Sequence, residues 1–264
     1  MVKSLFELSQ KCIEEMKGNE NMIMAKEDKQ TFYKTKNCCV CEECFRDDKD
    51  KVRDHDHRKG KFRGAAHNKC NINYFNNRFL PIVFHNLRGY DSHLIIKKAH
   101  DIVEKQLVSF KPQFKVIPNS YEKFMSFDIG PLKFIDSLQF MASSLEKLVE
   151  NLYDPEDRYR NFNHIKNEFP EHYDILCQKG FYPYEWVDSL DKFDHKGLPP
   201  MESFYSQLAQ KRIKDKEYIK AWKLYKKLKC EKFGDYHMIY LKTDVLLLAD
   251  VFENFRKTCM NYYG

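Results

Sequence analysis

Residues 38 to 71 read CCVCEECFRDDKDKVRDHDHRKGKFRGAAHNKCN, a segment dense in side chains that bind metal ions. Cys38 and Cys41 form one pair, and His67 and Cys70 form a second, with two residues between the members of each pair. Thiolate and imidazole ligands in two such pairs suit a closed tetrahedral zinc site. The segment therefore predicts a small zinc module with these four residues as its ligands.

The choice of sulfur ligands has alternatives within the same segment. Cys41 and Cys44 are also separated by two residues, and Cys39 lies beside the first ligand. A lone Cys-x2-Cys pair often binds no metal, but two ligand pairs that flank one short polar run are hard to obtain by chance. Zinc is therefore the favoured interpretation, and the register of the first pair stays open.

A second set of polar side chains lies between and just beyond these pairs. Asp54, His55, His57 and Asn71 supply carboxylate, imidazole and amide groups. Carboxylate and amide oxygens prefer magnesium or manganese, whereas thiolates prefer zinc. The set therefore predicts a separate hard-metal site, and a solvated polar loop is the alternative.

The segment resembles the His-Me finger (ββα-metal) endonucleases of the recombination endonuclease VII type. Their pattern is Cys-x2-Cys, then Asp-His-Asp-His, then Arg-Gly, then a ligand pair that ends in Cys-Asn. Arg63 and Gly64 fill the Arg-Gly position. His67 departs from the all-cysteine version, which changes the ligand but not the tetrahedral geometry. The spacing to the Asp-His-Asp-His run favours Cys38 and Cys41 as the first ligands.

This resemblance implies a role for each polar residue of the module. His55 would be the general base that activates water, because a neutral imidazole can accept a proton near pH 7. Asp54 and Asn71 would hold magnesium or manganese at the scissile phosphate, and His57 would support them. A zinc-stapled clamp that binds nucleic acid without cutting it is the alternative.

The composition is compatible with a polyanionic partner. The 264 residues carry a net charge of +6 and 15% aromatic residues, which suit phosphate contacts and base stacking in DNA. The nine cysteines are an odd number that clusters as metal ligands, so we expect a reducing intracellular compartment, the nucleus or the cytoplasm. No signal peptide or membrane-spanning run is visible, so no membrane partner is expected.

Hydrophobic periodicity predicts alternating strands and helices after a helical N-terminal segment at residues 1–37. Strands are expected at 79–84, 123–127 and 133–138. Helices are expected at 26–34, 91–105, 170–178, 201–208, 214–228 and 236–261, with a further helix opened by a capping box at 143–146. An apolar stripe of the last helix is expected to pack against a sheet, and it consists of Leu241, Val245, Leu248, Phe252 and Phe255.

The segment from Phe84 to Asp91 resembles the second exonuclease motif of family B DNA polymerases, Asn-x2-3-(Phe/Tyr)-Asp. Asn86, Tyr90 and Asp91 occupy the positions of this motif. The resemblance implies that Asp91 holds magnesium or manganese and that His85 and Asn86 contact DNA. A simple turn, in which these residues serve the backbone alone, is the alternative.

Further motifs follow in the order that the polymerase family has them. Ser137 and Leu138 match the Ser/Thr-Leu motif with which protein-primed polymerases touch single-stranded DNA. Lys179 resembles the lysine that these enzymes direct at the scissile phosphate, although a solvated surface lysine would look the same. Tyr240 and Asp244 fit the third exonuclease motif, Tyr-x3-Asp, in which the Asp binds metal and the Tyr orients the attacking water. One helical turn separates the two, so their side chains share a face.

Together the resemblances imply one architecture. It is an α/β, incomplete RNase H-like 3′-5′ exonuclease domain at residues 79–264, with a ββα zinc module inserted at residues 38–78 and a helical segment at residues 1–37. This looks like the exonuclease-side portion of a protein-primed family B DNA polymerase of the organellar, viral or Maverick/Polinton type. No Asp-x-Glu first motif precedes Cys38 and no polymerase palm follows, so the chain looks like a fragment or a truncated gene product.

Three functions are compatible with this architecture. The first is a part of a replicative DNA polymerase, a nucleotidyltransferase, whose partners would be DNA, the missing palm and a terminal protein. The alternatives are a stand-alone metal-dependent endonuclease and a noncatalytic DNA-binding remnant of a transposable element or virus. The first function predicts that the Asp91 and Asp244 carboxylates lie within roughly 10 Å of each other across one cleft. Ser137 would line that cleft, and Lys179 would point into it.

Overall fold

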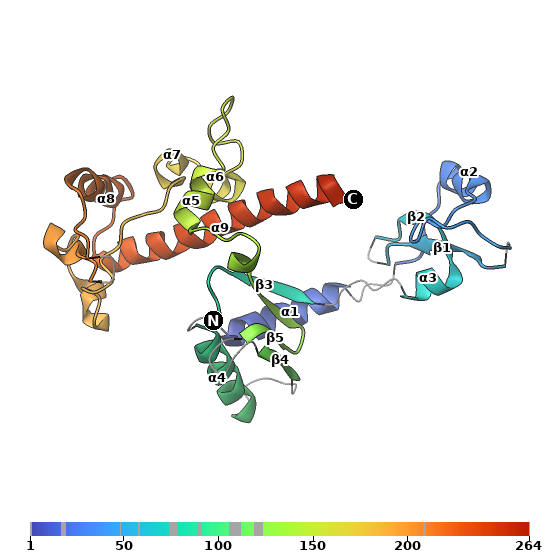
Figure 1. The fold of residues 1–264 in the computed structure, drawn as a ribbon, viewed down its shortest axis with the longest axis horizontal. Coiled ribbons are helices and arrows are strands. Elements are labelled where there is room, and N and C mark those ends of the chain that lie inside the picture. The colour runs from blue at the N-terminus through green and yellow to red at the C-terminus, as the bar shows by residue number, and fades with distance from the viewer. Residues whose placement is uncertain are drawn as a thin grey trace. The chain divides into compact units, whose positions relative to one another are not determined.

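Helices and strands are mixed along the chain in the computed structural model, which makes this an α/β protein (Figure 1). The chain forms two compact units, Met1–Asp136 and Ser137–Gly264, and each is described by itself. The structure describes residues 2–16, 20–47, 49–57, 59–73, 79–88, 91–105, 112–118, 124–207 and 210–263. Tyr90, Lys123 and Leu208, on which parts of the predicted motifs and elements rest, lie outside these ranges.

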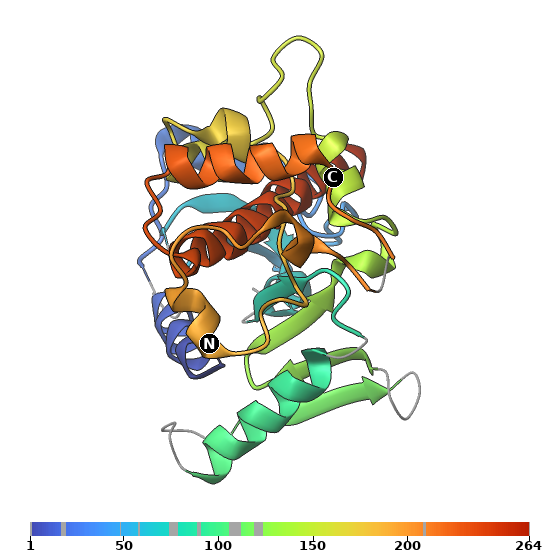
Figure 2. The ribbon, with the colours of Figure 1, turned by 90° about the vertical axis from the view of Figure 1, so that its left-hand side faces the viewer.

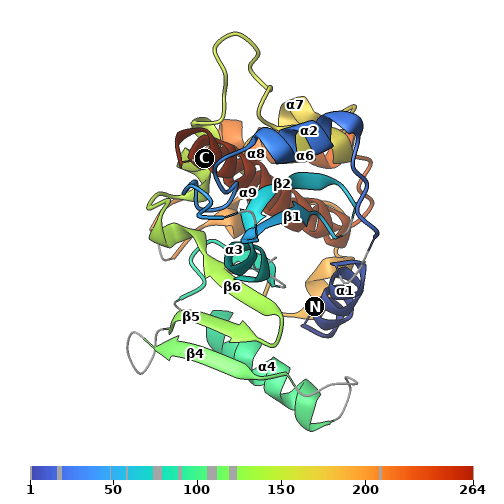
Figure 3. The same ribbon diagram turned by 90° about the vertical axis from the view of Figure 1, so that its right-hand side faces the viewer.

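The predicted zinc module is a strand hairpin followed directly by a helix, within the first unit (Figure 3). Strand β1 (Lys51–His55) pairs antiparallel with β2 (Phe62–His67), and α3 (Asn68–Asn73) follows. Helix α2 (Lys26–Lys34) begins and ends as predicted, and its buried side packs on the hairpin in a small apolar core. The order of these elements is the strand-strand-helix arrangement that the endonuclease resemblance implies.

A four-stranded sheet is the centre of the remainder of this unit. Its strands are β3 (Leu80–Phe84), β4 (Phe114–Pro118), β5 (Phe124–Ile129) and β6 (Leu132–Asp136), in the order β3-β6-β5-β4. Strand β3 runs parallel to β6, whereas β6, β5 and β4 form an antiparallel meander. Because β3 and β6 are parallel, the chain segments that follow them leave from the same edge of the sheet.

Two helices pack with the sheet in one apolar core. They are α1 (Val2–Met16) and α4 (Asp91–Glu104), and they also contact each other. Phe127 and Phe134, which pair across β5 and β6, stack with their ring centroids 4.5 Å apart. Burial of each such side chain stabilises the fold by about 1.5–3 kcal/mol, so this core is the main support of the sheet.

The second unit is built from helices. They are α5 (Leu145–Glu150), α6 (Asn163–Glu168), α7 (Tyr173–Leu176), α8 (Asp215–Lys227) and α9 (Phe233–Tyr263). Short 3-10 helices lie at Ser137–Gln139, Leu190–Asp194 and Met201–Phe204. Figure 2 shows α8, in orange, beside the red helix α9, and side chains of both share an apolar cluster. None of the described helices combines the length and the apolar character needed to cross a membrane.

Two predicted helix boundaries in this unit are wrong. Ser144, and not Ser143, caps α5, because its hydroxyl accepts a hydrogen bond from the backbone N–H of Lys147 at 3.3 Å. The helix expected at 201–208 is only a 3-10 turn that ends at Phe204. The backbone becomes extended after that turn and forms an isolated strand bridge, which ends the helical conformation.

The helix expected at 170–178 is also shorter, since α7 covers only its centre. The backbone oxygen of Cys177, just after α7, accepts a hydrogen bond from the Tyr153 hydroxyl at 2.6 Å instead of continuing the helix. A Cβ at Gly180 would lie 3.0 Å from the Tyr240 ring, so the loop approaches this ring closely and a larger residue would require the ring to shift by a few tenths of an ångström.

The buried face of α9 differs from the predicted apolar stripe. Leu241 is 45% exposed and Val245 is 67% exposed. The buried residues recur at spacings of three and four, and they are Phe233, Tyr236, Tyr240, Thr243, Leu247, Asp250 and Val251. Tyr240 and Asp250 belong to this face because each has a polar partner there. A count of apolar residues misses such side chains, so the prediction is wrong for Leu241 and Val245, whereas Phe252 and Phe255 of the predicted stripe do pack against the core.

Asp250 connects α9 to the start of α6. Its carboxylate is 2% exposed and accepts hydrogen bonds from the backbone N–H groups of His164 at 2.8 Å and Ile165 at 3.2 Å. The same carboxylate lies 2.8 Å from Nδ1 of His164. The first N–H groups of a helix have no partner within the helix and attract negative charge. A carboxylate of one helix thus caps another.

Candidate functional site

Four ligand-type side chains converge in the ββα module. Cys38 and Cys41 come from the turn before β1, His67 ends β2, and Cys70 lies in α3. All four ligand atoms lie within 4.8 Å of one another, and Nδ1 of His67 is 3.4 Å from the Cys41 sulfur and 3.9 Å from the Cys70 sulfur. Tetrahedral zinc with bonds of about 2.0–2.3 Å needs ligand atoms roughly 3.5–3.8 Å apart. These four predicted ligands form a group that could hold a metal ion such as zinc.

The sulfurs of this group bind their protons unequally. Burial acts to raise the pKa of the Cys38 thiol, but backbone hydrogen bonds, led by those from Cys41 and His67, lower the pKa to about 6. Burial, together with the neighbouring Cys41 and Cys38 sulfurs, raises the pKa of Cys70 to about 11. A thiolate therefore sits beside a thiol near neutral pH. A divalent cation would remove the repulsion that retains the second proton.

The orientation of His67 is set by the main chain of a nearby cysteine. Nε2 of His67 lies 3.3 Å from the backbone oxygen of Cys44, which leaves Nδ1 directed at the sulfurs. A hydrogen bond to the far nitrogen fixes the tautomer of a metal-binding imidazole. The Cys44 thiol instead donates to Oδ1 of Asn37 at 3.2 Å, and the Cys39 sulfur packs against Gly64. Neither of the alternative cysteines belongs to the ligand group.

The Asp-His-Asp-His run lies at the end of β1 and in the turn after it. The Asp54 carboxylate is 2% exposed and accepts a hydrogen bond from the Arg63 guanidinium at 2.8 Å. The ring centroids of His55 and His57 are 4.3 Å apart, and Asn71 lies in α3. Among the described His, Cys, Asp and Glu side chains, the groups whose ligand atoms converge include none from this run. The partner of Asp54 is therefore Arg63 of the same hairpin, and the pair stabilises the hairpin.

The turn after β3 is held by a carboxylate from the end of β6. Asp136 is 4% exposed and accepts hydrogen bonds from the backbone N–H groups of Asn86 at 2.9 Å and Arg88 at 3.2 Å. Asn86 has a φ of +72°, in the left-handed region that Asn tolerates better than most residues. Asp91, which is exposed, begins α4 just beyond this turn. Sequence reasoning missed the positioning role of Asp136, although this residue directly precedes the Ser/Thr-Leu motif.

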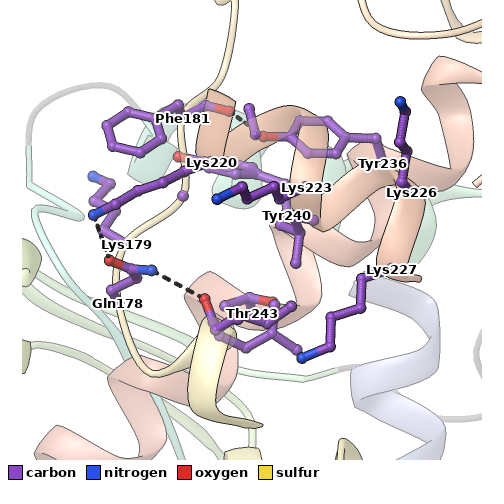
Figure 4. Close-up of a pocket in the computed structure, with 15 residues that line it drawn as sticks. Gln178, Lys179, Phe181, Lys220, Lys223, Lys226, Lys227, Tyr236, Tyr240 and Thr243 are labelled. Atoms are coloured by element: carbon purple, nitrogen blue, oxygen red, sulfur yellow. Dashed lines mark hydrogen bonds between the residues drawn. The ribbon is translucent and has the colours of Figure 1, made fainter. Parts of the chain in front are cut away.

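In the second unit, the predicted lysine and the third exonuclease motif lie together. Lys179 and Tyr240 line one pocket (Figure 4). Burial raises the pKa of Asp244, and the charge of Lys179 and a hydrogen bond from Tyr240 act against this rise. The hydroxyls of Tyr240 and Tyr184 are 2.5 Å apart. Oδ1 of Asp244 is buried and has no hydrogen-bond partner among the described residues, which suits a ligand for a cation.

Other residues of the predicted polymerase motifs are divided between the units. His85 is half-buried directly after β3, whereas Ser137 is buried and Leu138 half-buried in the 3-10 helix that begins the second unit. The predicted approach of Asp91 to Asp244 would join two units whose relative positions are not determined, so it stays a prediction. No protein-family model, no curated protein and no solved structure matches this chain.

Proposed function

We propose that this chain is the exonuclease-side portion of a protein-primed family B DNA polymerase, with a zinc module inserted in it. One observation carries the proposal: Lys179 and Tyr240 line the same pocket, and the charge of Lys179 acts on Asp244. Nothing local requires these residues to meet, because they come from a loop and from a helix much later in the chain. A second contact supports the same proposal. Asn86 of the predicted second exonuclease motif donates a backbone hydrogen bond to Asp136, the residue directly before the predicted Ser/Thr-Leu motif, so the two motifs are joined.

These side chains suit the handling of a DNA strand end. The Lys179 ammonium can bind a phosphate as a point charge, and the Tyr240 hydroxyl can orient a water molecule. Asp244 and Asp91 would hold magnesium or manganese, which neutralises charge on the phosphate during hydrolysis. We therefore expect this chain to bind single-stranded DNA.

Replacing Lys179 with Ala is expected to weaken binding of single-stranded DNA by about threefold to tenfold, because one phosphate contact is removed. Fluorescence anisotropy of a short labelled oligonucleotide at low salt measures this effect. Lys216→Ala is the matched control, since Lys216 is exposed on α8 and does not line the pocket. Equal weakening in both variants, or no binding by the unaltered chain, would contradict the proposal.

The zinc module supports a second candidate function, a metal-dependent endonuclease of the His-Me finger type. The specific observation is the hairpin and helix around the Cys3His group, with His55 ending β1 beside His57. His55 would accept a proton from water, and Asn71 would help to hold magnesium or manganese. The buried pair of Asp54 and Arg63 favours instead a clamp that binds DNA without cutting, because it occupies one proposed metal ligand.

Replacing His55 with Ala is expected to reduce magnesium-dependent nicking of plasmid DNA by about 10²–10⁴-fold, because the general base is lost. Zinc content should not change, since His55 is outside the ligand group. Conversion of supercoiled to nicked plasmid measures the activity, and His195→Ala, an exposed change in the second unit outside both groups of converging ligand atoms, is the control. Equal nicking by all three proteins excludes His55 as the base. Salt-sensitive binding with no nicking by any of them would indicate the clamp.

A further inference from the structure

A pocket of about 550 Å³ opens in the second unit between α8, the first half of α9 and the loop after α7 (Figure 4). Apolar and aromatic side chains form most of its wall, and they include Leu176, Phe181, Leu224, Tyr236 and Tyr240. The Tyr236 hydroxyl donates a hydrogen bond to the backbone oxygen of Phe181 at 2.5 Å, which fixes the loop against α9. The volume and the apolar wall are those of a small-molecule site.

One polar group in this wall has no partner. Thr243 lines the pocket and is 4% exposed, and its hydroxyl oxygen has no hydrogen-bond partner among the described residues. Buried polar side chains in folded proteins are nearly always hydrogen-bonded, and an unpaired one calls for an explanation. A ligand that offers a polar atom to Thr243 would supply the missing partner.

Five lysines surround the same pocket, and they are Lys179, Lys220, Lys223, Lys226 and Lys227. Within the part of the chain that the structure describes, Lys227 is the only one of the five in an ion pair, with Asp174 at 3.6 Å. Lys220, Lys223 and Lys227 recur at spacings of three and four, so α8 presents them on one face. The pocket therefore combines an apolar wall with an excess of positive charge.

We propose that this pocket binds a free nucleoside triphosphate, with the base against the aromatic wall and the phosphates among the lysines. Tyrosine and phenylalanine rings stack on any of the bases. The several charges of a triphosphate match several lysines, whereas the single carboxylate of a fatty acid would leave most of them unmatched. A polar atom of the nucleotide would bond to the Thr243 hydroxyl.

The inference that a nucleotide binds depends on the pocket alone. The inference that the nucleotide competes with DNA rests on the proposed polymerase function. Lys179 and Tyr240 line the pocket and also belong to the strand-end site. A nucleotide there would compete with the end of a DNA strand. The concentration of free nucleotide would then control access of DNA to these residues.

Isothermal titration calorimetry of the whole chain with ATP, without added divalent ions, tests the binding. The double variant Lys220→Gln, Lys223→Gln is expected to bind ATP about tenfold more weakly, because two phosphate contacts on the pocket face of α8 are lost. The control Lys216→Gln, Lys257→Gln removes the same charge from α8 and α9, outside the pocket, and should bind ATP like the unaltered chain.

A third variant tests the interior of the pocket. Thr243→Val exchanges the unpaired hydroxyl for a methyl group of similar size, so the thermal unfolding temperature should be unchanged or slightly higher. ATP binding should weaken severalfold, because the hydroxyl contact with the ligand is lost. Unchanged ATP affinity in this variant would remove Thr243 from the proposed site.

Several outcomes would overturn the inference. One is the absence of ATP binding at millimolar concentration, and another is equal weakening in the control double variant. Binding of palmitate but not ATP would show that the pocket is a lipid site. Binding of an oligonucleotide but not ATP, weakened by Lys220→Gln, Lys223→Gln, would assign the lysines to a strand end. ATP binding without DNA binding would leave the inference intact and contradict the polymerase proposal instead.

Discussion

Replacing Cys38 with Ser is expected to release zinc and to unfold the module formed by β1, β2 and α3. The apolar cluster of the module is small: among the residues that the structure describes, its buried members are Phe32, Phe62 and Ala65. Structural zinc contributes about 10–16 kcal/mol to the folding of such small modules, so loss of one ligand removes most of the stability. Zinc content by atomic absorption, together with limited proteolysis of the module, measures the result.

Cys44→Ser is the matched control for this prediction. The Cys44 thiol is directed at Asn37, and only its backbone oxygen supports His67. A serine keeps that backbone oxygen, so the variant should retain zinc and resist proteolysis like the unaltered chain. Loss of zinc in Cys44→Ser, with retention in Cys38→Ser, would mean that the ligand register described above is wrong.

Replacing Asp250 with Ala is expected to lower the free energy of unfolding of the second unit by about 3 kcal/mol. Two backbone N–H groups at the start of α6 and the His164 ring would lose their acceptor in a buried site. Both tryptophans, Trp186 and Trp222, lie in this unit, so the tryptophan fluorescence of the chain reports its unfolding. Urea denaturation followed by that fluorescence gives the difference in stability.

Glu253→Ala controls for the removal of a carboxylate from the same helix. Glu253 pairs with Arg256 one turn away, and the Arg256 side chain of that pair is 52% exposed. Exposed pairs of this kind contribute at most a few tenths of a kcal/mol, so the control should unfold like the unaltered chain. A similar loss of stability in both variants would show that the cap on α6 has no special importance.

The ligand group of the module could be predicted from the sequence because the spacing of ligands is a local property. Two residues between Cys38 and Cys41, or between His67 and Cys70, bring two side chains to one ion in almost any tight turn. The ends of α2 and α8 could be predicted to within a residue for a similar reason, since charge and apolar period act within one or two turns.

The buried face of α9 could not be predicted in this way. Asp250 is buried because it meets the start of α6, 86 residues earlier, and Tyr240 because it meets Tyr184, 56 residues earlier. The apolar periodicity of the α9 sequence does not indicate either of these contacts. The same is true of Asp136, which supports Asn86 from a neighbouring strand 50 residues later. Contacts of this range depend on the folded chain and not on local pattern.

The carboxylate of Asp136 lowers the conformational entropy of the turn after β3. The left-handed backbone of Asn86 is held by hydrogen bonds between elements of the protein and not by a ligand. Fixing the backbone of one residue costs roughly 1–2 kcal/mol in conformational entropy. In this turn the backbone is already fixed in the folded protein, before any ligand binds. The turn is therefore preorganised, and a DNA strand that contacts Asn86 would not have to order it first.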